Sequence, residues 1–348
     1  MEKITVQQIN NSIETTLCLW CGENNAKFKT LQKGYQEPQM FKIFCCESCN
    51  TAFSLPRVNS NEVYELIYKN ASEVQGYSRY QHYQDRVLIE KNPLNYLINN
   101  EPAYWSTTQA IKKILLLNKK ARILEVGSGL GYFTYSLKKD GYNIQGLDIS
   151  QNAVNEASAK FGDFYICDDL HRFAESNLES FDLVIMTEVI EHFNEPKEFV
   201  KSINKLLKKN GSFVFTTPNK SFYPNAVSWY TETPPVHCWW FSEKSIEQLA
   251  SDLSMRLNFI DFSDYYNKHP FISKIVNLDN QGHFIFNTKG ELIKKQSPQS
   301  TGFEMPRWLK KLRVYNKLRN YLFTTLFSEK YKIGGVQSNI ICAILQKN

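Results

Sequence analysis

The segment from Ile123 to Gly131 constrains the fold of this chain more than any other. An apolar run ends in Glu125 and is followed by Gly127, Gly129 and Gly131. This pattern indicates a buried strand that turns sharply into a helix, because glycines let the backbone bend tightly and approach a ligand where a Cβ would clash. The N–H groups at the start of the helix would face the bound molecule. Many nucleotide-binding folds share such a turn, so the segment alone does not identify the ligand.

Strand and helix patterns alternate after this loop. Further strands are expected over residues 143–148, ending near 167, over 181–187, over 213–217, over 256–262 and over 338–346, and helices over 107–120, 130–139 and 243–250. Such alternation predicts an α/β fold, a doubly wound and mostly parallel sheet with helices on both faces. Ser242 is expected to cap the last helix, with an incomplete capping box because Ser245 replaces the usual acid.

Acidic residues stand at the ends of successive strands. Asp148 ends the second strand, Asp168 and Asp169 follow the third, and the segment Glu188-Val-Ile-Glu-His192 follows the fourth. This series resembles the class I S-adenosylmethionine-dependent methyltransferases, in particular the ubiquinone-biosynthesis O-methyltransferase type. The resemblance covers roughly residues 105–264 and the last strand. It implies a Rossmann-like sheet of seven strands, whose last strand pairs antiparallel with the sixth.

The resemblance also implies a role for each residue of the series. The residues expected to hold the methionine part of the donor are Glu125, Gly127, Gly129 and Gly131. No phosphate-binding Lys or Arg follows the glycines, which favours a cationic donor over a dinucleotide.

The strand-end acids are expected to bind the rest of the donor. Asp148 would accept hydrogen bonds from both ribose hydroxyls, although a solvated loop acid is the alternative. Asp168 would accept a bond from the adenine amino group, with Asp169 as the alternate. Thr187 and Glu188 would lie beneath the sulfonium.

Two histidines are candidates for the general base. His192 lies just past the fourth strand, and His237 lies a few residues before Phe241-Ser242, at a position where the ubiquinone-type enzymes have a similar histidine. A base is useful when the acceptor is a hydroxyl, because its proton must leave. Either histidine could instead be structural, and Glu188, Glu191 and His192 could together bind a divalent ion.

Five of the eight cysteines lie between residues 18 and 49. Cys18 and Cys21 form one C-x-x-C knuckle, and Cys46 and Cys49 form a second. Two such knuckles can close a tetrahedral and therefore structural Zn²⁺ site. Cys45 could replace Cys46, but its spacing to Cys49 is less suitable, and free buried cysteines are the alternative. The ribbon resembles the zinc-binding N-terminus of bacterial methyltransferases from polysaccharide and natural-product pathways.

These patterns divide the chain into a zinc ribbon (1–60), a helical linker (61–104) and a methyltransferase domain (105–348) with an insertion at about 265–335. The tyrosine-rich stretch 77–83 of the linker is either a lid over the donor or a surface helix. Residues 307–327 of the insertion have a basic amphipathic helix pattern. This helix would expose a solvated basic face, or contact an anionic substrate or a membrane surface.

The net charge, the N-terminal residues and the cysteines limit the functions that we expect of this chain. The net charge of +6 is too small to imply nucleic acid by itself. The N-terminus lacks an apolar signal core, and the clustered cysteines point to a reducing cytoplasm. We expect an enzyme that O-methylates a hydroxyl of a sugar, glycan or other small molecule in a surface-polysaccharide or secondary-metabolite pathway. The alternatives are an RNA methyltransferase, whose ribbon would read RNA, and a donor-binding scaffold without catalysis.

Overall fold

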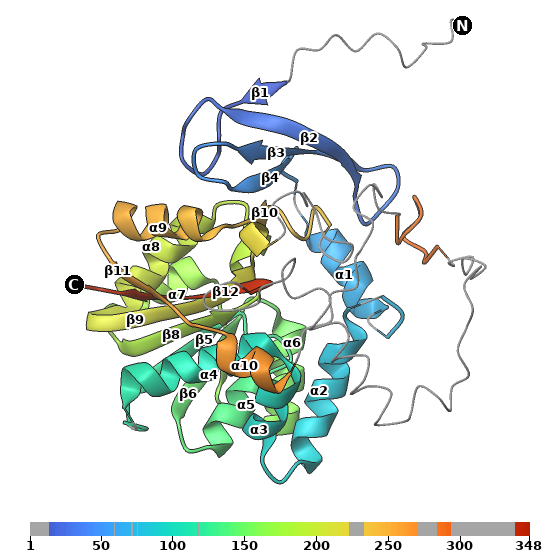
Figure 1. Cartoon of the computed structure of the whole chain (residues 1–348). Coiled ribbons are helices and arrows are strands. Elements are labelled where there is room, and N and C mark those ends of the chain that lie inside the picture. Colours follow the sequence, from blue (N-terminus) through green and yellow to red (C-terminus); the bar gives the residue numbers. More distant parts are fainter. Residues whose placement is uncertain are drawn as a thin grey trace, which may run out of the picture.

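Two β-sheets organise the chain in the computed structural model (Figure 1). The structure describes residues 14–58, 60–70, 72–74, 76–116, 118–222, 233–269, 284–293 and 338–348. The large sheet has seven strands in the order β11-β12-β9-β8-β5-β6-β7, and the small sheet has five in the order β1-β2-β3-β4-β10. None of the described helices is long and apolar enough to cross a membrane.

The large sheet confirms the predicted α/β fold. Its strands are β5 (Arg122–Val126), β6 (Asn143–Asp148), β7 (Tyr165–Cys167), β8 (Phe181–Thr187), β9 (Leu207–Pro218), β11 (Arg256–Phe259) and β12 (Ile340–Gln346). The strands from β7 to β9 run parallel, whereas β12 lies antiparallel between β9 and β11. The predicted antiparallel pairing of the last strand with the strand near 256 is therefore correct.

Helices cover both faces of this sheet because its strands are apolar on both faces. In β8, Leu183 and Ile185 pack against one apolar cluster, while Val184 and Met186 pack against the other. The helices are α4 (Pro102–Leu115), α5 (Tyr132–Lys139), α6 (Gln151–Phe161), α7 (Leu170–Ser176), α8 (Pro196–Leu206), α9 (Glu243–Asp252) and α10 (Ser263–Lys268). Helices α4 and α5 contribute to one of these clusters, and α7, α8 and α9 contribute to the other.

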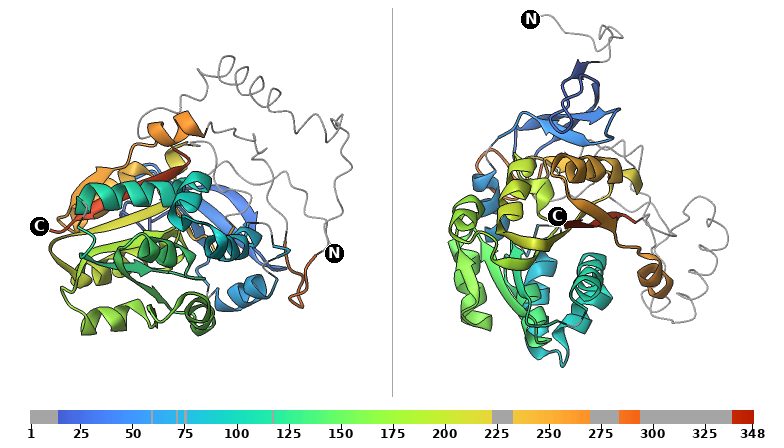
Figure 2. Two further views of the ribbon diagram at one scale, coloured as in Figure 1. Left: turned by 90° about the horizontal axis from the view of Figure 1, so that it is seen from below. Right: turned by 90° about the vertical axis from the view of Figure 1, so that its left-hand side faces the viewer.

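The small sheet contains strands from both halves of the chain. It comprises β1 (Thr15–Thr16), β2 (Ala26–Lys33), β3 (Met40–Cys46), β4 (Ala52–Leu55) and β10 (Trp239–Trp240). In β10, Trp239 pairs with Phe53 and Trp240 with Ala52. The small sheet therefore lies against α9 and the large domain in Figures 1 and 2. The predicted ribbon, which ends at residue 60, does not include this last strand.

Three helices connect the two sheets: α1 (Asn61–Lys69), α2 (Ser78–Ile89) and α3 (Pro93–Asn100). Asn92 caps α3, as expected for a helix that begins at a proline. Within the predicted insertion, residues 265–269 and 284–293 are described. The Ile285 and Phe286 N–H groups both donate to the Tyr35 carbonyl at 2.9 Å. The predicted basic helix at 307–327 lies outside the described residues.

Candidate functional site

The glycine loop joins β5 to α5 and forms the centre of the candidate site. Gly127, Gly129 and Gly131 have φ angles of +74°, +49° and +79°. A Cβ on Gly131 would lie 2.7 Å from both Ala157 and the Tyr165 ring, so this position requires glycine. Gly131 is also the N-cap of α5, which directs the first N–H groups of that helix toward the loop.

Asp148 contacts this loop from the end of β6. Its Oδ2 accepts a hydrogen bond from the Gly129 N–H at 2.7 Å, and its Oδ1 accepts one from the Ser150 N–H at 2.9 Å. Burial raises the pKa of the Asp148 carboxyl, and the backbone hydrogen bonds oppose that rise. Each carboxylate oxygen retains a further acceptor position. The two oxygens therefore suit a diol, which fits the ribose role predicted from the sequence.

Glu125 lies in β5 just before the loop and is buried, with 2% of its surface exposed. It accepts a hydrogen bond from the Thr134 hydroxyl of α5. Burial raises the pKa of the Glu125 carboxyl to about 8, and the nearby Asp148 charge adds to the rise. A cationic ligand would offset both effects and stabilise the ionised carboxylate. This environment suits the ammonium group of an amino acid.

The two acids after β7 have different surroundings. The Asp168 N–H donates to the Asp148 carbonyl at 3.2 Å, which places Asp168 beside the end of β6. Its carboxylate accepts a hydrogen bond from Arg172 Nε at 2.5 Å. The Asp169 carboxylate instead caps α7 and accepts bonds from the N–H groups of His171 and Arg172 at 2.9 and 3.1 Å. Asp168 is therefore better placed than Asp169 for the predicted adenine contact.

Glu188 has an unusual backbone conformation just after β8. Its φ is +55°, a region that non-glycine residues rarely adopt. The Glu188 N–H donates to the Thr216 carbonyl and hydroxyl at 3.2 and 3.1 Å. The buried Oε1 of Glu188 has no hydrogen-bond partner among the described residues. Burial raises the pKa of this carboxyl to about 7. Together with Thr187, this carboxylate occupies the strand end where a ligand is expected.

The two candidate histidines lie side by side. The ring centroids of His192 and His237 are 4.3 Å apart. His192 Nδ1 lies 2.7 Å from the Tyr64 hydroxyl, and its Nε2 lies 3.7 Å from Glu191 Oε1. Burial lowers the pKa of His192 to about 4 and that of His237 well below its usual range, and the neighbouring His192 charge lowers the His237 pKa further. Both rings are therefore neutral at physiological pH and offer an unprotonated nitrogen.

The same histidines belong to a potential cation site. Ligand atoms of Glu191, His192 and His237 lie within 4.8 Å of one another. The sequence predicted Glu188 as the third member of this group, whereas the structure brings His237 there. A carboxylate with two imidazoles is a donor set suited to first-row divalent metals.

Helix α2 lies over the glycine loop. Gln84 Nε2 donates to the Leu130 carbonyl at 3.3 Å. Arg79 pairs with Glu101 at 3.5 Å, and its charge lowers the pKa values of Glu188 and His237. His82, in contrast, is exposed, and its Nε2 lies 3.2 Å from the Tyr96 hydroxyl of α3. Arg79 belongs to the stretch 77–83 that the sequence predicted as a lid or a surface helix. Tyr64 and Gln84 are polar residues that sequence reasoning missed, and neither stands in a recognisable motif.

The four knuckle cysteines form one cluster. Their Sγ atoms lie within 4.8 Å of one another, with Cys18–Cys49 at 3.7 Å and Cys21–Cys46 at 3.5 Å. A tetrahedral ion with Zn–S bonds of about 2.3 Å would separate the sulfurs by about 3.8 Å, so the cluster fits Zn²⁺. Cys45 lies outside the cluster and packs with Ile43, Ala52 and Trp240. This arrangement agrees with the predicted choice of Cys46 over Cys45.

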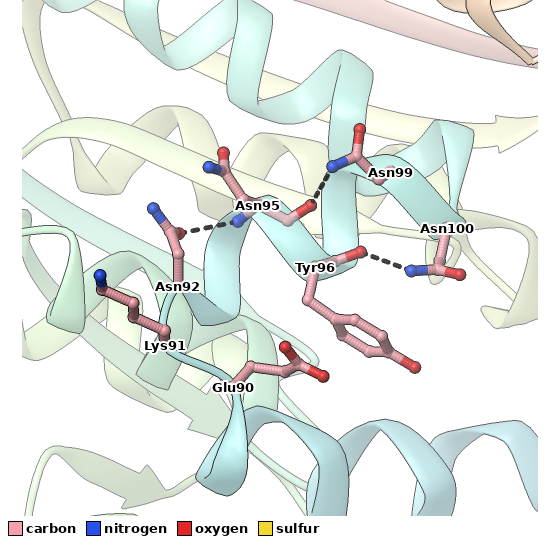
Figure 3. Close-up of a pocket in the computed structure, with 7 residues that line it drawn as sticks. All are labelled: Glu90, Lys91, Asn92, Asn95, Tyr96, Asn99 and Asn100. Carbon is pink, nitrogen blue, oxygen red and sulfur yellow. Dashed lines mark hydrogen bonds between the residues drawn. The ribbon is translucent and has the colours of Figure 1, made fainter.

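An open surface pocket of about 360 Å³ lies between the end of α2 and α3 (Figure 3). It is lined by Glu90, Lys91, Asn92, Asn95, Tyr96, Asn99 and Asn100. Several of its amide groups bond within α3: Asn99 Nδ2 donates to the Asn95 carbonyl at 2.8 Å, and Asn100 Nδ2 to the Tyr96 carbonyl at 2.7 Å. None of the predicted site residues lines this pocket.

Comparison with known proteins finds similarity over part of the chain. The family described as "Methyltransferase domain" matches residues 98–253. A ubiquinone biosynthesis O-methyltransferase of Coxiella burnetii (strain Dugway 5J108-111) is 24% identical over 152 residues, which cover 38% of this chain and 64% of that protein. The Idiomarina loihiensis enzyme of the same name is 31% identical over 114 residues, which cover 31% of this chain and 45% of that protein. In both cases the chain spans less than two thirds of its relative.

Among solved structures, a methyltransferase from Archaeoglobus fulgidus, described as dependent on S-adenosylmethionine, aligns with a TM-score of 0.38. Its sequence identity is 17%, and the alignment covers 69% of this chain and 94% of that one.

Proposed function

We propose that this chain, whose residues 98–253 match the methyltransferase-domain family, is a class I S-adenosylmethionine-dependent methyltransferase that methylates a hydroxyl of a sugar, a glycan or another small molecule. The observation that carries the proposal is the hydrogen bond of Asp148 to the glycine loop, together with the segment after β8. In that segment Val189 packs beside Gly127, and His192 lies against His237. We place the reaction in a surface-polysaccharide or secondary-metabolite pathway, on the resemblance of the ribbon to such enzymes.

Donor binding uses the charges of the strand ends. Glu125 would bind the ammonium of the methionine part, and Asp148 would accept bonds from the ribose hydroxyls. Asp168 would accept from the adenine amino group, and Thr187 and Glu188 would lie beneath the sulfonium. S-adenosylmethionine supplies a methyl group that is already activated, so the protein has mainly to align acceptor and donor.

Proton removal from the acceptor falls to the histidine pair. His192 is neutral at physiological pH because burial lowers its pKa to about 4. A weak base suffices here, since an oxygen that gains a methyl group while still protonated becomes a strong acid. We therefore assign His192 as the base and His237 as its neighbour in the acceptor site. Binding of a divalent ion by Glu191, His192 and His237 is the competing use of the same atoms.

Zn²⁺ would be structural in this scheme. The four cysteines would occupy all four tetrahedral positions and leave none open for a substrate. The ribbon contacts the large domain through Trp20, whose Nε1 donates to the Ser245 carbonyl at 2.9 Å, and through Ser242, whose hydroxyl donates to the Cys49 carbonyl at 2.9 Å. Metal binding would therefore stabilise the junction between the sheets.

The test of this function is methyl transfer from labelled S-adenosylmethionine to panels of nucleotide sugars, glycans and RNA. Label in a sugar or glycan is the expected result. Label in RNA, with an affinity that falls steeply with salt, would replace our proposal with an RNA methyltransferase. Donor binding with no label in any panel, together with a stable complex with another protein, would favour the scaffold alternative.

Asp148→Ala is expected to weaken donor binding at least about tenfold, because a hydrogen bond to a charged group contributes ~1.5–3 kcal/mol. Loss of the Gly129 contact would add to the effect. Calorimetric titration with S-adenosylhomocysteine measures it. Asp163→Asn, which changes an exposed acid, is the matched control and should bind normally. Unchanged affinity in the alanine variant would contradict our placement of the donor.

Donor affinity is also expected to depend on pH through Glu125. Its pKa in the free protein is raised to about 8, so between pH 6 and 7.5 the carboxyl is mostly protonated and must lose its proton to bind an ammonium group. Affinity should therefore rise with pH in this window, by up to about tenfold per unit. The binding enthalpy should vary with the ionisation enthalpy of the buffer. Glu188, whose pKa is raised to about 7, should contribute a smaller part of both dependences. Glu125→Gln should therefore reduce them, and an unchanged slope in that variant would exclude Glu125.

A further inference from the structure

We propose that Tyr64 of helix α1 is a positioning residue of the methyl-transfer site, which orients the ring of His192. This inference rests on the proposed function. The Tyr64 hydroxyl lies 2.7 Å from His192 Nδ1, and the two ring centroids are 6.2 Å apart. Tyr64 is more than 120 residues from His192 in the chain and belongs to the segment between the ribbon and the methyltransferase domain.

The Tyr64 hydroxyl can either donate a hydrogen bond to His192 Nδ1 or accept one from it. We assign it as the acceptor, and this assignment fixes the tautomer of His192. A neutral imidazole has one N–H and one lone pair. When Nδ1–H donates to the Tyr64 oxygen, the lone pair is at Nε2, the nitrogen that lies 3.7 Å from Glu191 Oε1. The proton of the acceptor hydroxyl can then pass to Nε2, while the oxygen bonds the methyl carbon and the carbon–sulfur electrons return to sulfur. The Glu191 carboxylate is placed to stabilise the resulting imidazolium.

Tyr64 is held firmly enough for such a role. Val63 and Ile67 of α1 are buried in one cluster with Tyr35 and Val236, and Tyr64 packs against the same cluster. Val236 directly precedes His237, so α1 is packed on the loop that carries the second histidine.

The ribbon sheet fixes that loop from its other side. The Ser54 N–H of β4 donates to the Cys238 carbonyl at 3.1 Å, and the Cys238 N–H donates to the Glu191 carbonyl at 3.0 Å. The N-terminal module, meaning the ribbon and α1, thus packs on the loop that carries His237 and contributes Tyr64 to the histidine pair.

Tyr64→Phe removes the hydroxyl and keeps the ring, and it is the variant that tests this inference. With an acceptor that the full chain methylates, we expect kcat to fall by about 10-fold or more, while the affinity for S-adenosylhomocysteine and the melting temperature stay unchanged. Tyr142→Phe removes a hydroxyl from a buried tyrosine before β6 and should leave kcat unchanged. A wild-type kcat for Tyr64→Phe would overturn the proposal.

A double variant separates positioning from general structural damage. Because Tyr64 acts through His192, adding Tyr64→Phe to His192→Ala should not lower kcat further. A further loss equal to that of the single Tyr64 variant would show that Tyr64 acts independently and would contradict the proposal.

A measurement on the tautomer needs no activity and stays informative if the proposed function fails. Imidazole ¹⁵N resonances of the full chain should show His192 protonated at Nδ1, and this preference should weaken in Tyr64→Phe. A proton at Nε2 of the wild-type ring would overturn the inference, whatever reaction the enzyme performs.

Discussion

Replacing His192 with alanine is expected to lower kcat by about 100-fold or more and to leave the affinity for S-adenosylhomocysteine unchanged. General base catalysis typically contributes 10²–10⁴-fold, which sets the expected size. The donor contacts assigned to Glu125, Asp148 and Asp168 do not involve this ring, so binding should survive. Single-turnover methyl transfer and calorimetry on the same preparation measure the two quantities.

His171→Ala is the matched control for this prediction. His171 lies on α7, where its Nδ1 is 2.8 Å from the Ser202 hydroxyl, and it belongs to neither the donor contacts nor the histidine pair. His237→Ala should have a smaller effect than His192→Ala, because His237 lacks the Tyr64 contact. If kcat falls further in His237→Ala than in His192→Ala, His237 is the base and His192 is its neighbour in the acceptor site. If turnover in His192→Ala stays at the wild-type level, the base lies elsewhere.

Cys46→Ser is expected to cost the protein its bound zinc and to unfold the ribbon. Apparent binding energies for structural Zn²⁺ in small finger peptides are ~10–16 kcal/mol, and loss of one thiolate removes a large part of such a value. The loss of structure in the ribbon should extend from β4 to β10, because these strands pair through Phe53 and Trp239. Metal analysis should give less than stoichiometric zinc, and hydrogen exchange should increase over β2–β4.

Cys45→Ser is a control from the adjacent position. Its sulfur lies outside the cluster of four, so this variant should retain zinc and exchange protection. Full zinc in Cys46→Ser together with loss in Cys45→Ser would reverse the ligand assignment. Full zinc in both variants would refute the Cys₄ site.

The sequence predicted the large sheet well because its signals are local. Each parallel strand is an apolar run followed by a turn, as in Phe181–Thr187. The acid that follows the strand can be recognised without any knowledge of the neighbouring strands.

The cap of α9 was predicted less accurately. Ser245 completes the capping box of α9: its hydroxyl accepts from the Ser242 N–H at 2.7 Å, so the expected incomplete box was wrong. A serine hydroxyl supplies the acceptor that the usual acid would provide.

The sequence did not predict the long-range contacts. Strand β10 has two residues and pairs with β4 from almost 190 positions away, which no periodicity can indicate. The contact between Tyr64 and His192 depends on the same packing of the N-terminal module. The sequence proposed His192 and His237 as competitors, and only the fold shows that they are neighbours.

The central claim is that the chain binds S-adenosylmethionine at the glycine loop, and calorimetric titration of the purified full chain tests it most directly. We predict micromolar binding of both S-adenosylmethionine and S-adenosylhomocysteine, weakened at least about tenfold in Asp148→Ala. No heat of binding from either ligand, with a folded protein, would contradict the account.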